Sequence, residues 1–348
     1  MARTDNFTNF ATDVADSIRS MTGKTGKIPA SQFDTEIKSI NVGTSEDLTE
    51  ELNTYDTNLT TQETTLEDIV KALQGKASGG GSGELATGIV VSELNENGLP
   101  KTITINNATV PNYCFYGNST SNQNILTTNL EKLIFKNTLK TGANICYNCK
   151  NLKEVVFDDT LEEIETYAFY NCYNATFQFS KSGNLKTIGQ YAFQKSSGIS
   201  YIPESVTTLE NGAYYQTTNN TIKTIPDSIT ELSESVFRES DITQMSMNNV
   251  TIINGGASLR GTFNSTQSLK ALWIGSEIIS IGRYALNNST VTKIFIDRPK
   301  AGIESLSYYS TKWSNNTLSS DCQIIGNDEE GFMTKEEFDS IDWATHTG

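Results

Sequence analysis

Two cysteines, Cys146 and Cys149, stand at a spacing that could support chemistry. A Cys-x-x-Cys pair can supply half of a zinc site or a redox couple. However, the same Tyr-Asn-Cys triplet ends at both Cys149 and Cys172, and free cysteine is among the most buried residue types. We therefore interpret these cysteines as small core residues, and we predict no metal site, no cofactor and no disulfide framework.

Other catalytic groups are sparse. The single histidine, His346, stands near the C-terminus, so a Ser-His-Asp or Cys-His arrangement has no imidazole within the repeated region. Glycoside hydrolysis needs two carboxylates across a cleft, whereas the acidic residues between 158 and 165 cluster at expected turns, where charge is usually solvated. Residues 328–331 lack the alternating ligands of a calcium-binding loop. We expect a protein that is not an enzyme.

The composition argues against several partner classes. The formal net charge is −15 and the isoelectric point is about 4.6, so a phosphate backbone or an anionic lipid surface would be repelled. No run approaches the roughly 18 apolar residues of a membrane span, and the first residues lack the apolar stretch of a secretory signal. We expect no nucleic acid partner, no membrane insertion, and synthesis in a cytoplasm.

A motif repeats through the middle of the chain and must position any surface that the protein uses. Tyr167-Ala168-Phe169 returns as Tyr191-Ala192-Phe193, and its phenylalanine slot recurs every 21 to 31 residues. The members of this slot are Phe115, Cys146, Phe169, Phe193, Tyr214, Phe237, Phe263 and Leu286. A period of this length is typical of a solenoid, whose stacked coils bury one continuous core.

Apolar stretches between the slots predict the strands of each coil. Stretches of Leu-x-x-Leu-x-Leu type occupy residues 130–135, 152–157, 242–247, 269–274 and 291–296. In each, the first, fourth and sixth residues are predicted to point into the solenoid and the intervening ones outward, because side chains alternate along a strand. A second apolar stretch, such as 161–164 or 278–282, precedes the next turn. We expect these stretches to stack as parallel strands.

The repeats resemble a known family. The segments Ile202-Pro203-Glu204-Ser205-Val206-Thr207 and Ile225-Pro226-Asp227-Ser228-Ile229-Thr230, with the Tyr-Ala-Phe turns, resemble leucine-rich repeats of the BspA-like class over roughly residues 99–300. The resemblance implies a leucine-rich-repeat domain at 84–300, and because a solenoid needs a cap at its end, we expect a C-terminal cap at 301–348. Such repeats are used by adhesins, host-contact proteins and virion proteins, so the ligand stays open. The pattern is irregular at Cys146, Tyr214 and Gly255-Gly256.

The N-terminal part follows other periodicities. Residues 4–21 and 31–40 carry apolar side chains three or four apart, which predicts two short amphipathic helices. A heptad pattern runs through residues 48–73, and residues 76–83 form a Gly/Ser-rich linker. The sequence thus predicts an α+β fold: N-terminal helices and a parallel coiled coil, followed by a leucine-rich-repeat solenoid with a parallel β-sheet.

The heptad seam predicts a trimeric stalk over residues 44–75. Leucine fills the a positions and the d positions are mixed, which is not the usual choice of a dimer. Gln62 can bond to its symmetry copies and fix the register. The predicted trimerisation residues are Leu48, Leu52, Tyr55, Leu59, Gln62, Leu66, Ile69 and Leu73. The alternative is a single amphipathic helix that packs on the solenoid.

The N-terminal segment carries a second resemblance. Residues 18–28, running into residues 33–40, are similar to the opening of tail and fibre proteins from tailed bacteriophages of Gram-positive or gut bacteria. In that family such openings join the virion, so the resemblance implies a virion-attachment segment at residues 1–43. Its anchor residues would be Phe7, Ala11, Val14, Ile18, Phe33 and Ile37. The order of parts, from anchor through stalk and joint to a repeat-built head, supports this interpretation.

The leading hypothesis is a structural fibre protein at the tail or capsid surface of a bacteriophage virion. It would be a homotrimer that contacts other virion proteins through its N-terminus and a host cell-surface glycan or protein through its heads. Three weak heads on one stalk gain avidity without a strong single site. The alternatives are a head fibre or baseplate decoration without a receptor role, and a bacterial leucine-rich-repeat surface adhesin.

Outward strand positions are the predicted binding residues. They are Lys132, Glu154, Tyr201, Thr224, Gln244, Ser246, Trp273 and Phe295. Trp273 and Phe295 are predicted to lie one coil apart on the same face, where exposed aromatic side chains would suit a sugar ring or a protein anchor. In the alternative interpretation, residues 300–348 fold back and cover these two side chains.

Overall fold

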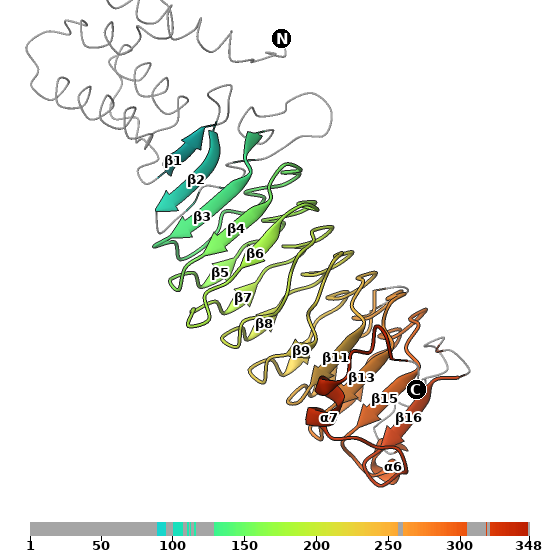
Figure 1. Cartoon of the computed structure of the whole chain (residues 1–348). Helices are drawn as coiled ribbons and strands as arrows, with labels where there is room; N and C mark the ends of the chain where they lie inside the picture. The colour runs from blue at the N-terminus through green and yellow to red at the C-terminus, as the bar shows by residue number, and fades with distance from the viewer. Residues whose placement is uncertain are drawn as a thin grey trace, which may run out of the picture.

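The computed structural model describes residues 89–94, 100–106, 110, 112, 115, 129–256, 260–304, 318 and 321–346. These residues form an elongated solenoid of stacked coils (Figure 1). The predicted N-terminal helices, trimeric stalk, virion anchor and Gly/Ser linker lie outside the described residues. The parts described below therefore belong to the predicted repeat domain and its C-terminal cap.

Two five-stranded sheets carry the long strands of the coils. The first contains β1 (Ile89–Leu94), β2 (Pro100–Asn106), β3 (Lys132–Lys136), β4 (Glu154–Phe157) and β6 (Thr176–Gln178), in that order. The second contains β9 (Thr224–Ile225), β11 (Gln244–Met247), β13 (Ala271–Ile274), β15 (Lys293–Ile296) and β16 (Gln323–Gly326). All neighbours pair in parallel except β1 and β2, which are antiparallel. The predicted parallel strands are confirmed, with each beginning two residues later than its apolar stretch.

A second row of short strands lies further along each coil. One three-stranded parallel sheet contains β5 (Glu163–Ile164), β7 (Thr187–Ile188) and β8 (Thr208–Leu209), and the other contains β10 (Glu231–Leu232), β12 (Ile252–Ile253) and β14 (Ser280–Ile281). The predicted second apolar stretches contain these strands: β5 lies within residues 161–164 and β14 within residues 278–282. In each of these six strands one residue is buried and its neighbour is partly or fully exposed, so each of these six coils contributes an apolar side chain from this row to the core.

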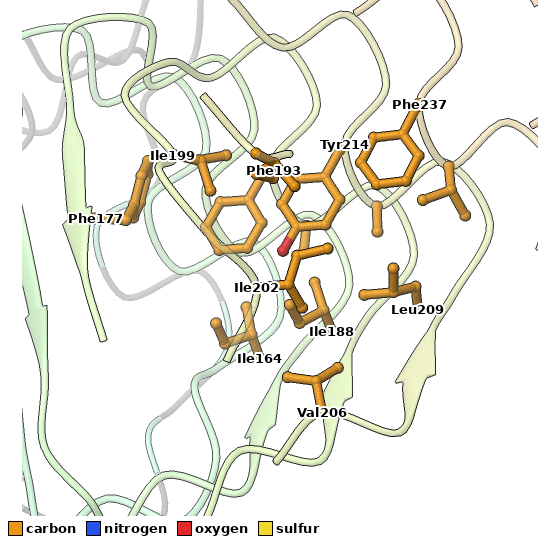
Figure 2. Close-up of a cluster of buried hydrophobic side chains, with 14 of the residues drawn as sticks. Ile164, Phe177, Ile188, Phe193, Ile199, Ile202, Val206, Leu209, Tyr214 and Phe237 are labelled. Carbon is orange, nitrogen blue, oxygen red and sulfur yellow. The ribbon is translucent and has the colours of Figure 1, made fainter. Parts of the chain in front are cut away.

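The phenylalanine slot builds the centre of the core, as predicted. All eight members are buried to within 1% of full burial. The rings of Phe193 and Phe237 stack on the two sides of the Tyr214 ring, with centroid distances of 5.5 Å on both sides (Figure 2). Offset stacks of this kind add to the stability that area burial provides. Cys146 occupies the slot in its coil and is fully buried, which confirms that it is a core residue.

Each Tyr-Ala-Phe turn uses left-handed backbone at its first and fifth residues. Tyr167 and Asn171 have φ values of 53° and 59°, and Tyr191 and Lys195 repeat this geometry one coil later. The resulting turn directs alternate backbone N–H groups along the solenoid axis. Phe169 N, for example, donates to the carbonyl oxygen of Ala192 at 2.8 Å. These bonds between coils satisfy buried amides and offset part of the cost of left-handed backbone, about 1–2 kcal/mol per residue.

Helices are few among the described residues. The helix α6 (Lys300–Glu304) precedes β16, and α7 (Lys335–Ser340) follows it. A capping box starts α7, because the Thr334 hydroxyl accepts from the Glu337 amide while the Glu337 carboxylate accepts from the Thr334 amide. Neither helix has the length and apolarity that a bilayer crossing requires. The described fold is thus a parallel β-sheet solenoid of leucine-rich-repeat type, and the helical part of the predicted α+β fold lies outside it.

Candidate functional site

Two rows of outward side chains cross the first sheet. One row contains Thr102, Lys132, Glu154 and Thr176, which are strand partners in register, and the other contains Thr104, Ile134, Val156 and Gln178. The alternation along β3 and β4 follows the prediction, since the residues between these outward positions are buried in the core. Thr102 and Thr104 on β2 are buried, at 7% and 9% exposure, so we call the outward side chains of β3, β4 and β6 the open face.

Ion pairs and hydrogen bonds connect the polar groups of the open face. Lys132 Nζ lies 2.8 Å from a carboxylate oxygen of Glu154, whose other oxygen accepts from the Gln178 amide at 2.8 Å. At the neighbouring end, Lys101 Nζ pairs with Glu93 at 2.8 Å. Hydrogen bonds from Lys101 and Thr102 lower the pKa of the Glu93 carboxyl. Charges on this face are therefore balanced by neighbours, and the face offers many hydrogen-bonding groups.

Tyr201 stands where the first sheet ends. Residues 199–203 occupy the place in their coil where a long strand would lie, but they form no strand. Pro203 has no backbone N–H to donate to a neighbouring strand. The Tyr201 hydroxyl donates to the carbonyl oxygen of Phe179 at 2.8 Å, and its ring meets the Phe179 ring edge-on at a centroid distance of 5.9 Å. The side chain is still 36% exposed. Of the predicted binding residues, Lys132, Glu154, Tyr201 and Thr224 are therefore exposed or half-buried.

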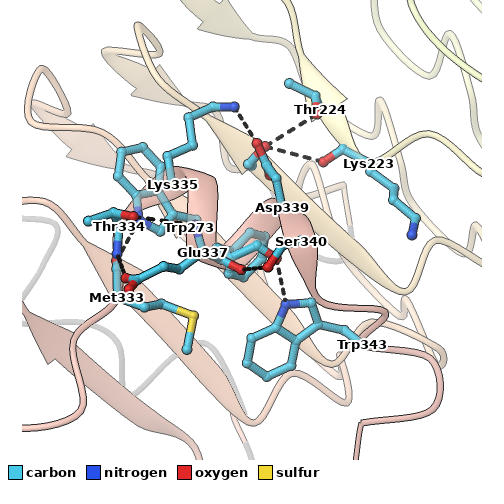
Figure 3. Close-up of polar contacts among 12 residues, drawn as sticks. Lys223, Thr224, Trp273, Met333, Thr334, Lys335, Glu337, Asp339, Ser340 and Trp343 are labelled. Atoms are coloured by element: carbon cyan, nitrogen blue, oxygen red, sulfur yellow. Dashed lines mark hydrogen bonds and ion pairs between the residues drawn. The ribbon is translucent and has the colours of Figure 1, made fainter.

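The other four predicted binding residues are buried, so their assignment to a free binding face is wrong. Gln244, Ser246, Trp273 and Phe295 are between 0% and 4% exposed. C-terminal residues cover Trp273 and Phe295, as the alternative interpretation held, and Trp343 also contacts Gln244. Figure 3 shows Trp273 beneath the start of α7, where the Trp273 indole Nε1–H donates to the carbonyl oxygen of Met333 at 3.1 Å.

A second apolar cluster holds the cap on the sheet. It contains Ala271, Trp273, Phe295, Phe338 and Trp343. The Trp343 ring lies 5.9 Å from the Phe295 ring and 5.3 Å from the Phe338 ring. The Trp343 amide donates to the Gln244 side-chain oxygen at 3.3 Å. Trp273 and Phe295 thus act as the cap's docking surface, and the capping box before Phe338 is a sequence signal for the start of the helix that carries Phe338.

Cys146, Cys149 and Cys172 are core residues, as expected. They are fully buried and form no disulfide bond. The Cys149 thiol donates to the Phe115 carbonyl at 3.2 Å, and the Cys172 thiol donates to the Cys146 carbonyl at 3.0 Å. Burial raises the pKa of the Cys149 and Cys172 thiols well above the usual value. The thiolate that metal binding or redox chemistry needs is therefore disfavoured.

Comparison with known proteins identifies the repeat. A family model described as "BspA type Leucine rich repeat region" matches in six copies over residues 139–258 and 248–329, which together exceed half of the chain. A search of curated proteins found no match.

Solved structures also resemble this chain, at low identity. A leucine-rich repeat protein from Eubacterium ventriosum is 17% identical, with 59% of this chain and 69% of that chain covered and a TM-score of 0.32. A leucine-rich cell surface protein from Faecalibacterium prausnitzii is 16% identical, with 58% and 75% covered and a TM-score of 0.28. The pneumococcal vaccine antigen PcpA is 14% identical, with 70% and 84% covered and a TM-score of 0.30. The family assignment therefore rests on the repeat model.

Proposed function

This chain belongs to the family of proteins with a BspA-type leucine-rich repeat region, and from this premise we propose that it is a structural fibre protein of a bacteriophage virion. Its N-terminus joins the particle, residues 44–75 form a trimeric stalk, and each repeat domain contacts the host surface through the open face. The chain works by binding and not by catalysis. Its partners are other virion proteins and a host cell-surface glycan or protein.

The open face is the observation that supports binding. Its outward rows carry an ion pair, an amide and a hydroxyl from three adjacent strands, whereas Trp273 and Phe295 in the corresponding rows at the other end of the solenoid are covered by the cap. Extended polar surfaces of this kind suit many weak contacts spread over a large partner. Three such faces on one stalk would convert weak contacts into avid attachment.

The virion assignment is supported by the order of the parts in the sequence. Residues 1–40 resemble the opening of phage tail and fibre proteins, and a heptad seam and a Gly/Ser linker separate them from the head. The same head would also serve a bacterial surface adhesin, and the same stalk would serve a head fibre or baseplate decoration. Oligomeric state and cell attachment separate these possibilities.

The first test is the solution mass of the full chain and of a fragment that begins at Glu84, by light scattering after size exclusion. We expect a trimer that becomes a monomer on truncation. A monomeric full-length chain would contradict the stalk and leave a repeat-binding module or an adhesin.

The second test is attachment of the labelled full chain to a panel of bacterial cells. The double variant Lys132→Ala with Gln178→Ala removes groups from the open face and should weaken attachment. The matched control, Lys186→Ala with Glu204→Ala, changes two exposed residues elsewhere on the coils and should leave attachment unchanged. If the open-face variant attaches as well as the control variant, the open face is excluded as the contact surface.

A further inference from the structure

Half-buried tyrosines form a connected group on the turns of the solenoid, separate from the outward strand rows. We call Tyr147, Tyr167, Tyr170, Tyr191 and Tyr215 the tyrosine band. Tyr147 and Tyr170 stack at 4.3 Å and 11°, and Tyr167 and Tyr191 stack at 5.1 Å and 23°. Contacts of 6.3 Å between Tyr147 and Tyr167 and 6.4 Å between Tyr191 and Tyr215 join the pairs. The band therefore runs along the axis over successive coils.

The fold does not need tyrosine at these positions. The turn position of Tyr167 and Tyr191 holds Asn144 and Ser235 in other coils, with φ values of 55° and 60°. The position of Tyr170 and Tyr215 is likewise held elsewhere by Gln194, Asn264 and Asn287. Bulky side chains are disfavoured at positive φ, yet Tyr167 and Tyr191 adopt it. Because polar residues build the same turn, folding alone does not explain these aromatic rings.

One neighbouring position is shaped around the band. Gly212 lies where the next coil would otherwise place a side chain, and a Cβ atom there would stand 2.2 Å from Cε1 of Tyr191. Because Gly212 has no side chain, the Tyr191 ring of the preceding coil can lie over Gly212. The Tyr191 ring thereby reaches Tyr215, which belongs to the same coil as Gly212. The continuity of the band thus depends on a specific glycine.

Hydrogen-bonding groups border the aromatic surface. The Asn171 amide donates to the Asn148 side chain at 2.7 Å, and the Gln216 amide donates to Glu239 at 2.8 Å. At the end of the band Arg238 lies 4.9 Å from the Tyr215 ring centroid, and it pairs with Glu239 at 2.7 Å. The charge of Arg238 is balanced by Glu239, Lys195 Nζ lies 5.7 Å from the Tyr170 ring centroid, and the chain as a whole carries a net charge of −15. A polyanion would therefore gain little here, while amides and phenolic hydroxyls suit a ligand rich in hydroxyl groups.

We propose that the tyrosine band binds an uncharged polysaccharide whose chain lies along the solenoid axis. Successive coils are about 4.8 Å apart, which is close to the length of one sugar ring in an extended glycan chain. Each coil can therefore meet one sugar in turn. Apolar C–H groups of the sugars contact the tyrosine rings, and sugar hydroxyls bond to the amides and phenolic hydroxyls. The proposal goes beyond the open face and does not depend on the virion assignment.

The test applies the full chain to an array of linear uncharged oligosaccharides of hexoses and N-acetylhexosamines, beside uronic acid and sulfated glycans. Two double variants borrow residues that the fold already uses in the same slots: Tyr170→Gln with Tyr215→Gln, and Tyr167→Asn with Tyr191→Asn. Circular dichroism checks that both fold. The control Tyr284→Asn removes a tyrosine from the same turn position in a distant coil.

We expect binding to at least one uncharged glycan, a loss of apparent affinity of tenfold or more in both band variants, and no change in the control. The open-face variant Lys132→Ala with Gln178→Ala should also bind normally. No uncharged ligand on the array, or binding confined to charged glycans, would overturn the proposal. So would affinity lost only in the open-face variant, which would instead support the proposed host-contact face. Cell attachment that needs the band when no arrayed glycan binds would identify a protein partner and equally overturn it.

Discussion

The replacement Tyr214→Phe should stabilise the protein, because the Tyr214 hydroxyl is buried in the apolar core and has no hydrogen-bond partner among the residues that the structure describes. Figure 2 shows this oxygen among Ile188, Ile202 and neighbouring side chains. A buried polar group without a partner costs about 1–3 kcal/mol. Phenylalanine keeps the ring between Phe193 and Phe237, and other coils already use phenylalanine in this slot.

The expected gain in the free energy of unfolding is about 1–2 kcal/mol, since a small void replaces the oxygen. For a repeat domain of this size that corresponds to a rise in melting temperature of about 2–8 °C. Urea unfolding followed by circular dichroism measures the free energy directly. The neighbouring Tyr215→Phe is the matched control. The Tyr215 hydroxyl makes a long, part-buried hydrogen bond of 3.4 Å to Glu239, so its removal should change the free energy of unfolding by no more than about 0.5 kcal/mol.

Alkaline pH sharpens the test. Burial raises the pKa of the Tyr214 phenol well above its ordinary value of about 10, so at alkaline pH the phenol stays neutral in the folded chain and ionises in the unfolded chain. Its contribution to stability is present below pH 10 and falls as the pH rises above it, by about 1.4 kcal/mol per pH unit. The advantage of Tyr214→Phe should therefore grow above pH 10. A variant less stable than the natural chain would refute the reasoning and indicate an unseen partner such as a buried water.

Three further changes have defined outcomes. Gly255→Ala should destabilise the chain by more than about 2 kcal/mol in urea unfolding, because the new Cβ atom would lie 1.9 Å from the Arg283 carbonyl oxygen. The control Gly302→Ala places its Cβ atom where α6 has room for it and should be neutral or stabilising. Trp343→Ala removes a buried ring worth about 3–5 kcal/mol, so hydrogen exchange should show α7 released while the strands stay protected; an unchanged α7 would contradict the docking described above. Cys149 and Cys172 should resist iodoacetamide at pH 8 until the chain unfolds, and mass spectrometry of rapid native labelling at either residue would contradict their burial.

The repeat could be predicted from the sequence because its signals are local and periodic. Every member of the phenylalanine slot is buried, and the predicted strands occur in the predicted order. The alternation of side chains along a strand also gave the direction of Trp273 and Phe295 correctly. Alternation cannot say what lies above an outward side chain, because that depends on residues distant in sequence. The contact of Trp273 with Met333, sixty residues away, decides its burial.

The tyrosine band and the orphaned Tyr214 hydroxyl show a second limit. Both lie in repeat slots whose backbone the sequence predicts, yet their chemistry depends on neighbours in adjacent coils. Tyr191 reaches Tyr215 only because the slot between them is Gly212, and Tyr214 lacks a partner only because the surrounding residues are aliphatic or aromatic. A repeat pattern predicts the same backbone and burial for every member of a slot. It does not predict how the side-chain contacts differ from one member to the next, and those differences determine what each coil can bind.

The residue types in the outward rows differ between the part of the solenoid that the cap covers and the part that it leaves uncovered. Uncovered positions on the open face hold Lys132, Glu154 and Gln178, and covered positions at the other end hold Trp273 and Phe295. An exposed Trp273 and Phe295 would leave an apolar patch prone to association, so the cap and these rings are best understood as one unit. Large aromatic residues at outward positions of a repeat therefore predict a docked segment first, and a ligand only when the chain offers nothing to cover them. The tyrosine band differs from them in this respect, since its residues lie on turns and stay half-buried.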